Sequence, residues 1–455
     1  MSPRPAASPS LSPTDGPAAL LAAWPADRPL AMLAWHGGGS DGPGRTFAAT
    51  PVHRTELRGP NALSELRTLL SSAKTHSTAT AEERPEGDLL HGPSGKGFFV
   101  MLGYDLFRQL ESSAVASHGA IDDRSWPDAI LLRCEGGLLA TDGAMRIRGD
   151  AAFVPRLSPR RIPRPSIGSI TTDRSADQYR AMVAEVVERI RRGDCFQANV
   201  AQRFGARFRG SVRAVATAAF SAAVPRHGGL LECGPGRAVV SMSPELFLEA
   251  RPGSSGIEVR TRPIKGTRPA STPPEELLRS EKDTAELAMI VDLMRNDLGR
   301  ICRIGSVEVV EGRRIESHPT VHHGVAEIRG VLRPDADLVD LLEASFPPGS
   351  ITGAPKVQAM RIIDELEPFR RGPYCGAVGW IGDDGMMSLN VAIRTICCTG
   401  VPLARADELD GRLDYHAGCG IVADSEPEAE YRESLDKTEV FRRALAGLTI
   451  GPERP

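Results

Sequence analysis

Residues 175–193 read SADQYRAMVAEVVERIRRG and carry the start, the apolar stripe and the stop of an amphipathic helix. Ser175 and Gln178 have the spacing of a capping box, in which each side chain accepts a backbone N–H at the helix start. Gly193 stands where a C-terminal cap belongs. The apolar side chains between them recur at helical spacing and are Tyr179, Met182, Val183, Val186, Val187 and Ile190. The pattern predicts a helix that packs on a core.

The surrounding segments favour an α+β fold. Downstream, strand-like segments at 197–204, 238–241, 246–250 and 257–261 precede a helix over about 281–298. Upstream, 30–35 and 97–106 look like strands and 63–70 like a short helix. This order differs from a repeating βαβ pattern, so it predicts mixed and antiparallel sheets with helices to one side.

The chain divides by composition into four parts. Residues 1–17 are rich in Pro, Ser and Ala and are expected to form a disordered tail, and residues 18–164 form an N-terminal region with a polar insertion at 75–96. A stretch rich in Pro and Arg begins at Pro155 and leads into a linker, 165–174. Residues 175–450 form the main domain.

Composition excludes several functional classes. The 455 residues are 41% hydrophobic, and 58 acidic against 55 basic side chains leave a net charge of only -3. This balance does not favour nucleic acid or a membrane as the partner. The expected partner is therefore a small molecule. The eight cysteines include no C-x-x-C pair, and no apolar stretch near the N-terminus resembles a signal, so the expected place is the cytoplasm with reduced thiols.

Lys265, in the run TRPIKGTRP at 261–269, is a candidate covalent nucleophile. An ordinary lysine has a pKa of about 10.4, so a nucleophilic amine needs burial or a neighbouring cation to stay partly neutral. Arg262 and Arg268 are close in sequence. The alternative is a surface lysine in a Pro/Gly turn.

Two pairs of acids share a three-residue spacing. Asp283 and Glu286 lie on the helix over 281–298, and Glu430 and Glu433 lie near the C-terminus. If the pairs face each other, their oxygens suit Mg²⁺, which takes one or two carboxylates, several waters and substrate oxygens. The alternative is two solvated helix faces.

Three further runs carry candidate binding groups. FPPGSITGAPK at 346–356 leads into a helix over 357–366 and offers backbone N–H groups to an anion such as a carboxylate. Arg394 lies in the strand-like run VAIRT at 391–395, where its partner is a substrate carboxylate or a structural one. The glycines of AGCGIVADS at 417–425 permit close backbone approach, and Cys419 is read as a small buried residue rather than a nucleophile.

These five runs, in this order, resemble the chorismate-utilising enzymes from about residue 175 to residue 442, and more weakly through GYDLFRQLE at 103–111 and WPD at 126–128. The resemblance implies an anthranilate synthase component I-like fold, in which large mixed and antiparallel sheets form a sandwich with helices outside. It also implies Mg²⁺ as cofactor and chorismate as substrate.

The run GDCFQANVAQR at 193–203 and Lys265 look most like the aminodeoxychorismate branch. Anthranilate synthases usually have alanine in place of Lys265, and isochorismate and salicylate synthases typically have a lysine in place of Gln197. The implied reaction converts chorismate and ammonia to 4-amino-4-deoxychorismate, a precursor of p-aminobenzoate and folate. The alternatives are anthranilate or 2-amino-2-deoxyisochorismate synthesis, and an inactive partner-binding subunit.

The same resemblance implies roles for single residues. Lys265 is the covalent nucleophile, Glu245 the general acid and His323 a group near the leaving hydroxyl. Glu286 and Glu433 hold Mg²⁺ directly, with Asp283 and Glu430 reaching it through water. The expected substrate contacts are Gln197, Thr267, Thr352, Gly353, Arg394, Gly418, Gly420 and Lys437.

Two departures from the family pattern are Pro348, where a glycine is usual, and Ser388, where an aspartate is common. Because the sequence has no G-x-C-x-G segment of a glutamine amidotransferase, the expected source of ammonia is a separate glutaminase subunit.

Overall fold

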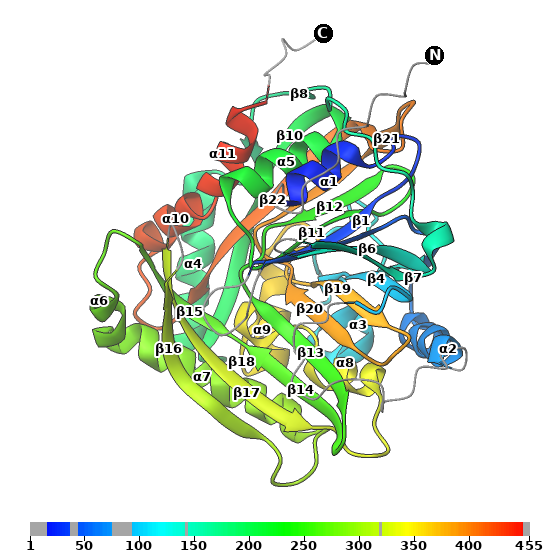
Figure 1. Cartoon of the computed structure of the whole chain (residues 1–455). Coiled ribbons are helices and arrows are strands. Elements are labelled where there is room, and N and C mark those ends of the chain that lie inside the picture. Colours follow the sequence, from blue (N-terminus) through cyan, green and yellow to red (C-terminus); the bar gives the residue numbers. More distant parts are fainter. Residues whose placement is uncertain (1–15, 37–43, 75–92, 142–143, 318–320, 449–455) are drawn as a thin grey trace, which may run out of the picture.

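The computed structural model describes residues 16–36, 44–74, 93–141, 144–317 and 321–448. Two large sheets run through this part of the chain, and every pair of neighbouring strands in them is antiparallel (Figure 1).

The first sheet has twelve strands. Ten lie in the order β18, β10, β22, β21, β12, β11, β1, β2, β6, β7, while β8 and β9 pair with β10. Their bounds are β18 (Gly353–Ala354), β10 (Gln197–Ser211), β22 (Glu408–Ile421), β21 (Thr395–Pro402), β12 (Arg237–Ser241), β11 (His227–Glu232), β1 (Ala31–Trp35), β2 (Arg45–Ala49), β6 (Gly136–Thr141), β7 (Ala144–Gly149), β8 (Ser166–Ile167) and β9 (Thr171–Thr172).

The second sheet has ten strands. Nine lie in the order β15, β17, β14, β13, β20, β19, β4, β5, β3, and β16 pairs with β17. Their bounds are β15 (Ile264–Pro269), β17 (Val321–Val331), β14 (Gly256–Arg262), β13 (Leu246–Gly253), β20 (Met387–Val391), β19 (Ala377–Gly382), β4 (Gly97–Leu102), β5 (Ala129–Cys134), β3 (His53–Leu57) and β16 (Glu308–Ser317).

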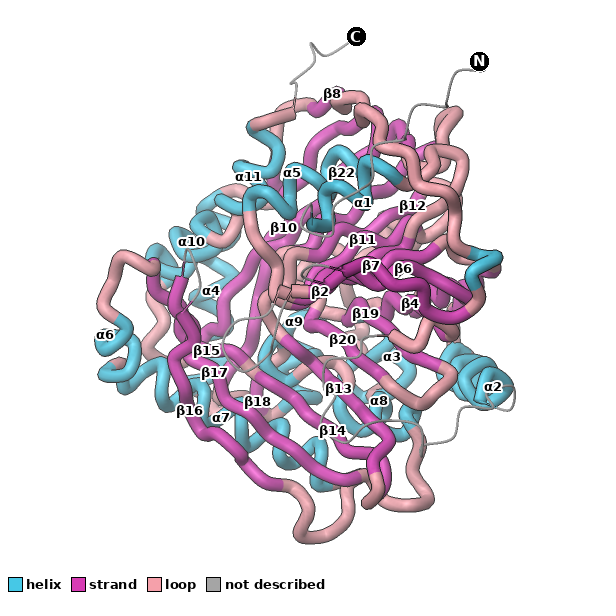
Figure 2. The backbone as a smooth tube through the Cα atoms, viewed as in Figure 1, coloured by secondary structure: helices cyan, strands magenta, loops and turns pink. Residues whose placement is uncertain are grey.

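Helices cover the outer faces of both sheets (Figures 1 and 2). The first sheet carries α1 (Gly16–Ala23), α5 (Val212–Ala222) and α11 (Glu439–Ala446), and its end at β10 and β22 carries α4 (Ala176–Arg191), α9 (Lys356–Leu366) and α10 (Pro427–Asp436). The second sheet carries α2 (Ala62–Lys74), α3 (Phe107–Leu110), α6 (Pro274–Arg279), α7 (Glu281–Gly299) and α8 (Leu338–Ser345).

The inner faces of the two sheets pack directly on each other. Phe47 of the first sheet stacks on Phe99 of the second with ring centroids 5.5 Å apart, and Trp380 meets both rings edge-on. All three rings are buried. The predicted sandwich with outer helices is therefore confirmed.

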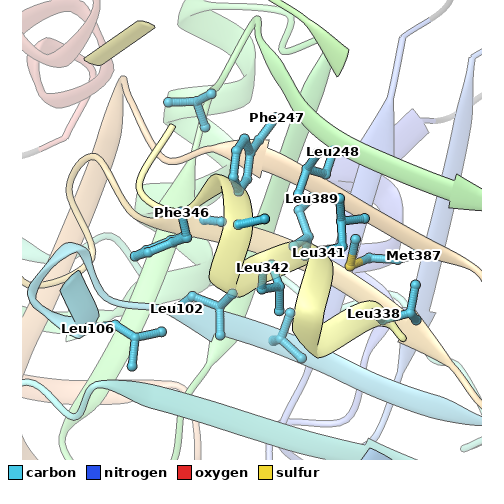
Figure 3. Packing of buried hydrophobic residues seen from close by; sticks show 14 of the residues in the cluster. Leu102, Leu106, Phe247, Leu248, Leu338, Leu341, Leu342, Phe346, Met387 and Leu389 are labelled. Atoms are coloured by element: carbon cyan, nitrogen blue, oxygen red, sulfur yellow. The ribbon is translucent and has the colours of Figure 1, made fainter. Parts of the chain in front are cut away.

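Helix α8 packs its apolar side on the outer face of the second sheet (Figure 3). Leu338, Leu341 and Leu342 point toward a group of sheet side chains that includes Phe247 and Leu389. This packing fixes the start of β13, which directly follows Glu245.

Several predicted elements agree with the structure. Helix α4 begins with the capping box between Ser175 and Gln178, and its buried stripe contains the predicted apolar residues except Ile190, which is partly buried. The helices predicted over 63–70, 281–298 and 357–366 correspond to α2, α7 and α9.

Two predicted strands were too long. The strand over 97–106 ends at Leu102, because the chain turns into a 3-10 helix (Tyr104–Leu106) at which the Asp105 carboxylate accepts the Gly372 N–H, 2.9 Å away. The strand over 391–395 is interrupted: β20 ends at Val391, β21 begins at Thr395, and Arg394 between them has a φ of 49°.

Both sheets contain strands from each side of the proposed linker at 165–174, so the described part of the chain forms a continuous structure across it. The division at that linker stays a prediction. Residues 16–17 of the predicted tail belong to α1, whereas 1–15, most of the insertion (75–92) and 449–450 lie outside the described residues. Within the described residues, no helix has the length and apolarity that a membrane span requires.

Candidate active site

A cavity of about 1310 Å³ lies between the ends of the two sheets, α7 and α10. It brings together residues that are far apart in the sequence. Those of the predicted site residues that line it are Glu245, Lys265, Thr267, Asp283, Glu286, His323, Arg394, Gly418, Gly420, Glu430, Glu433 and Lys437. Gln197, Thr352 and Gly353 lie behind this lining.

Lys265 reaches across the cavity from β15 to β22. A Cβ placed on Gly420 would stand 3.2 Å from Lys265 Nζ and 2.9 Å from Gln197 Nε2, so glycine is what lets these two groups meet. Lys265 has no ion pair with any described residue. Gln197 is fully buried, and neither its amide oxygen nor its amide nitrogen has a hydrogen-bond partner within the described structure.

Glu245 is a buried carboxyl on the cavity wall. The Ser243 hydroxyl accepts its backbone N–H at 3.2 Å and donates to the Val391 carbonyl at 2.6 Å, which fixes the position of Glu245. Burial raises the pKa of Glu245 to about 7, against opposing effects of the Ser350 hydroxyl and the Lys265 amine. The carboxyl is therefore available as a proton donor near neutral pH.

His323 lies opposite Thr267 where β15 pairs with β17, and its Nδ1 is 2.9 Å from the Thr267 hydroxyl. Its neighbour His322 contacts the Ser317 hydroxyl at 2.8 Å. His323 is thereby held against the cavity, while His322 is engaged outside it.

Arg394 has no ion pair with any described residue, although burial lowers the pKa of its guanidinium. Its positive φ turns the chain out of the strand between β20 and β21, where the side chain lines the cavity. No described carboxylate lies within ion-pair distance of Arg394, although Glu245 is near enough to oppose this lowering of the pKa. A planar cation left without a partner in a cavity suits an anionic ligand.

The four predicted metal ligands come from two helices on one wall. Glu286 on α7 and Glu433 on α10 are close enough that Glu433, with Asp283, adds to the burial that raises the pKa of Glu286. The Ser425 hydroxyl donates to Glu430 at 2.7 Å, and Arg268 donates to Asp283 at 2.8 Å. Four carboxylates on one wall, one of them with a raised pKa, offer the oxygen ligands that suit a hard divalent cation such as Mg²⁺.

Lys437 borders these acids and binds Glu433 Oε1 and the Gly418 carbonyl, each at 2.8 Å. Cys419 is 1% exposed, and burial raises the pKa of its thiol to about 12. It is thus a buried packing residue, as expected from the sequence.

In the loop at 346–356, Thr352 and Gly353 make contacts within the protein and do not line the cavity. Thr352 donates its hydroxyl to the carbonyls of Pro348 and Gly349, at 3.2 and 3.3 Å, so it is used within the loop. Gly353 pairs with Ala198, and any Cβ there would collide with the Gln197 carbonyl. Pro348 and Ser388, the two departures, also lie off the cavity lining.

Comparison with known proteins agrees with this geometry. The sequence profile described as "chorismate binding enzyme" matches residues 34–443, which is most of the chain. The chain belongs to the chorismate binding enzyme family.

Three relatives within the family share one name. Aminodeoxychorismate synthase component 1 of Salmonella typhimurium is 36% identical over 377 residues, 78% of this chain and 77% of that protein. The protein of that name from Escherichia coli is 42% identical over 283 residues, 59% of this chain and 58% of its own length. The protein of that name from Bacillus subtilis is 33% identical over 416 residues, which are 84% of this chain and 82% of that protein.

Solved structures of family members share the fold. Anthranilate synthase component I from Streptococcus pneumoniae superposes with a TM-score of 0.71 at 25% identity and covers 90% of this chain and 92% of that one. The menaquinone-specific isochorismate synthase of Escherichia coli superposes with a TM-score of 0.68 at 17% identity, covering 95% and 91%. The anthranilate synthase component I-like fold is thus confirmed.

The structure also adds cavity residues that sequence reasoning missed in this family member. They are Asn199, Ser350, Tyr374 and His416. Asn199 and Ser350 stood inside motifs already singled out. His416 shares the alternation of Gly418 and Gly420 along a strand, which was the available signal, whereas Tyr374 comes from a loop whose sequence gives none.

Proposed function

We propose that this chain converts chorismate and ammonia to 4-amino-4-deoxychorismate and water. One observation carries the proposal: the Lys265 amine stands beside Gln197 and Gly420 in a cavity that also holds Glu245, whose pKa is about 7. The relatives named aminodeoxychorismate synthase component 1 support the same reaction.

In the first step, the Lys265 amine forms a bond to ring C2 as the C4–O bond breaks. Glu245 donates its proton to the departing hydroxyl, which leaves as water, and Lys265 sheds one proton to solvent. In the second step, ammonia bonds to C4 while the C2–N bond to Lys265 breaks. The ammonium group formed at C4 gives one proton to Glu245, and the departing lysine nitrogen takes one proton from solvent to replace the one it shed, so both side chains return to their starting states.

The charged substrate groups have partners on opposite elements. Arg394 would bind one carboxylate in a bidentate manner, and Lys437 would fix the acidic wall. Glu286 and Glu433, with Asp283 and Glu430 through water, would hold Mg²⁺. When bound, the ion would neutralise and polarise the ring carboxylate of chorismate.

Ammonia would come from a separate glutaminase subunit, since the relatives are named as component 1 of a synthase. Free ammonium would replace it at higher concentration. Anthranilate synthase component 1 of Haloarcula marismortui is also similar, 43% identical over 290 residues. Lys265 favours amination at C4 over that alternative.

The test is to incubate the purified chain with chorismate, Mg²⁺ and ammonium, and to identify the product. We expect 4-amino-4-deoxychorismate from the wild type, and a fall in turnover of about 10²-fold or more for Lys265→Ala, because the covalent step is lost. Anthranilate with release of pyruvate would refute the proposal.

Lys282→Ala is the matched control. Lys282 also borders the cavity, but its side chain is 59% exposed and lies 4.0 Å from Glu286, whose side chain is 16% exposed, so the solvated lysine forms only a long ion pair. Its loss should change turnover less than about threefold. Equal losses in the two variants would remove Lys265 from the covalent step.

A further inference from the structure

His416 lines the active-site cavity without a place in the reaction described above. It lies on β22 four residues before Gly420 and two before Gly418, so the three residues face the same side of the strand. At about 3.4 Å per residue, His416 stands roughly 14 Å along the strand from the point where Lys265 meets Gly420. One cavity wall thus runs from the nucleophile to this histidine.

The imidazole of His416 is held by stacking and not by hydrogen bonds to described residues. Its ring stacks on Tyr374, with centroids 4.8 Å apart and planes 10° from parallel. His416 is 8% exposed, and neither ring nitrogen bonds to a residue that the structure describes. Nδ1 is buried, which leaves Nε2 as the nitrogen that can face the cavity. An unbonded Nε2 on a rigidly held ring in a cavity wall is open to a ligand, which points to a binding role rather than to a purely structural one.

Three arginines lie near enough to His416 to affect its pKa, and each is held by its own acid. Arg203 binds Asp123 at 2.7 Å, Arg371 binds Glu367 at 2.7 Å, and Arg124 binds Asp414 at 2.6 Å. Burial and these three guanidinium groups hold the pKa of His416 well below its usual range. The imidazole is therefore neutral in the working pH range, with one nitrogen able to accept a hydrogen bond.

Arg371 also supports the other side of the stack. Its guanidinium lies between the rings of Tyr104 and Tyr374, 4.6 and 5.5 Å from their centroids, and donates to the Asn199 carbonyl. Asn199 itself lines the cavity. Arg371 thus holds the Tyr374–His416 stack in place, because it cannot move without breaking its buried ion pair with Glu367.

We propose that His416, stacked on Tyr374, forms a subsite for neutral ammonia within the cavity. This inference rests on the proposed function. Ammonia donates an N–H to the free ring nitrogen, and the arginines oppose the ammonium ion, which leaves its proton in bulk water before it reaches the site. The subsite therefore holds the nitrogen nucleophile in its reactive, uncharged form.

The experiment measures initial rates against ammonium concentration at saturating chorismate and Mg²⁺, for the wild type, His416→Leu and His416→Gln. We expect His416→Leu to lose about tenfold in kcat/KM for ammonia, with the KM for chorismate within about twofold of the wild type. Glutamine keeps a polar group near the ring nitrogen, so His416→Gln should retain at least a third of the wild-type value.

A loss in His416→Leu that is smaller than twofold, or an equal loss toward chorismate and ammonia, would overturn the subsite. Should leucine prevent folding, the comparison of His416→Gln with His416→Asn decides, because their amides occupy the places of different ring nitrogens. Different values of kcat/KM for ammonia support the subsite, and equal values overturn it. A wild-type chain that makes no 4-amino-4-deoxychorismate at any ammonium concentration would refute the proposed function itself.

Discussion

Two buried polar regions of this chain differ in how their hydrogen bonds are satisfied. Arg213 on α5 is fully buried, and its guanidinium donates to both oxygens of Glu232 and to the carbonyls of Trp24, Pro25 and Arg28. Glu232 also accepts the Leu30 N–H at 2.8 Å. Beside the cavity, the equally buried Gln197 has no partner for its amide among the described residues, and neither does His416 for Nδ1.

This difference distinguishes polar groups that stabilise the fold, such as Arg213, from polar groups that remain able to bind a ligand. All five N–H donors of Arg213 are used, so nothing about it calls for a further molecule. The groups around Lys265 keep their hydrogen-bonding capacity at a cost in stability, which is typical of a binding site. Substitution should therefore affect the free energy of unfolding in the first region and turnover in the second.

The largest effect on stability is expected from Arg213→Met. Removing the arginine leaves Glu232 buried without its cation and leaves three carbonyls without donors. Breaking a buried ion pair in this way costs about 3–5 kcal/mol of the free energy of unfolding. Denaturant or thermal unfolding of the purified variant measures the loss.

Arg209→Met is the control for that substitution. Arg209 pairs with Asp410, but their side chains are 65% and 47% exposed, so the loss should stay below about 1 kcal/mol. Equal losses at Arg213 and Arg209 would contradict the structural reading of the Arg213 region.

Glu245→Gln should move activity and stability in opposite directions. Glutamine cannot give a proton to the leaving hydroxyl, so turnover should fall by about 10²-fold. The wild-type kcat should itself fall as pH rises through about 7, the pKa to which burial raises Glu245, because the acid form is lost.

The stability effect has a definite sign. The folded chain keeps the Glu245 proton up to a pKa of about 7, whereas an unfolded glutamate releases it near its usual 4.5. The wild type therefore loses stability between these two pH values, and glutamine does not. The free energy of unfolding should be measured for both proteins at pH 5 and at pH 8. The difference, variant minus wild type, should be about 1–3 kcal/mol larger at pH 8 than at pH 5. If this difference in the free energy of unfolding were instead smaller at pH 8 than at pH 5, the raised pKa of Glu245 would be contradicted.

Much of the fold was predictable because the signals are local. The capping box at Ser175 and the apolar stripe of α4 specify a helix without any long-range information. The exact end of β4 and the break at Arg394 were not predictable, since they depend on the contact of Asp105 with Gly372 and on a positive φ at an ordinary residue. The pairing of N-terminal strands with both sheets is equally non-local.

The candidate site shows the same division. Motifs identified twelve residues that the fold brings to one cavity. They also suggested Thr352 and Gly353, whose roles in the structure are a hydroxyl bonded within its own loop and a close strand contact. His416 was missed because its lowered pKa depends on burial and on three arginines at distant positions in the sequence.

The smallest predicted effect comes from Gly420→Ala. The added Cβ would stand 2.9 Å from Gln197 Nε2 and 3.2 Å from Lys265 Nζ, so it displaces the ends of two flexible side chains but no backbone. Turnover should fall by about tenfold because the amine moves from its place, while the free energy of unfolding changes by less than about 1 kcal/mol. Gly299→Ala is the control: no atom lies within 4 Å of its Cβ position at the end of α7, so turnover should be unchanged and stability slightly higher. If Gly420→Ala instead destabilises the chain by several kcal/mol and leaves turnover intact, Gly420 belongs with Arg213 among the residues that hold the fold, and the boundary between the two regions has been drawn in the wrong place.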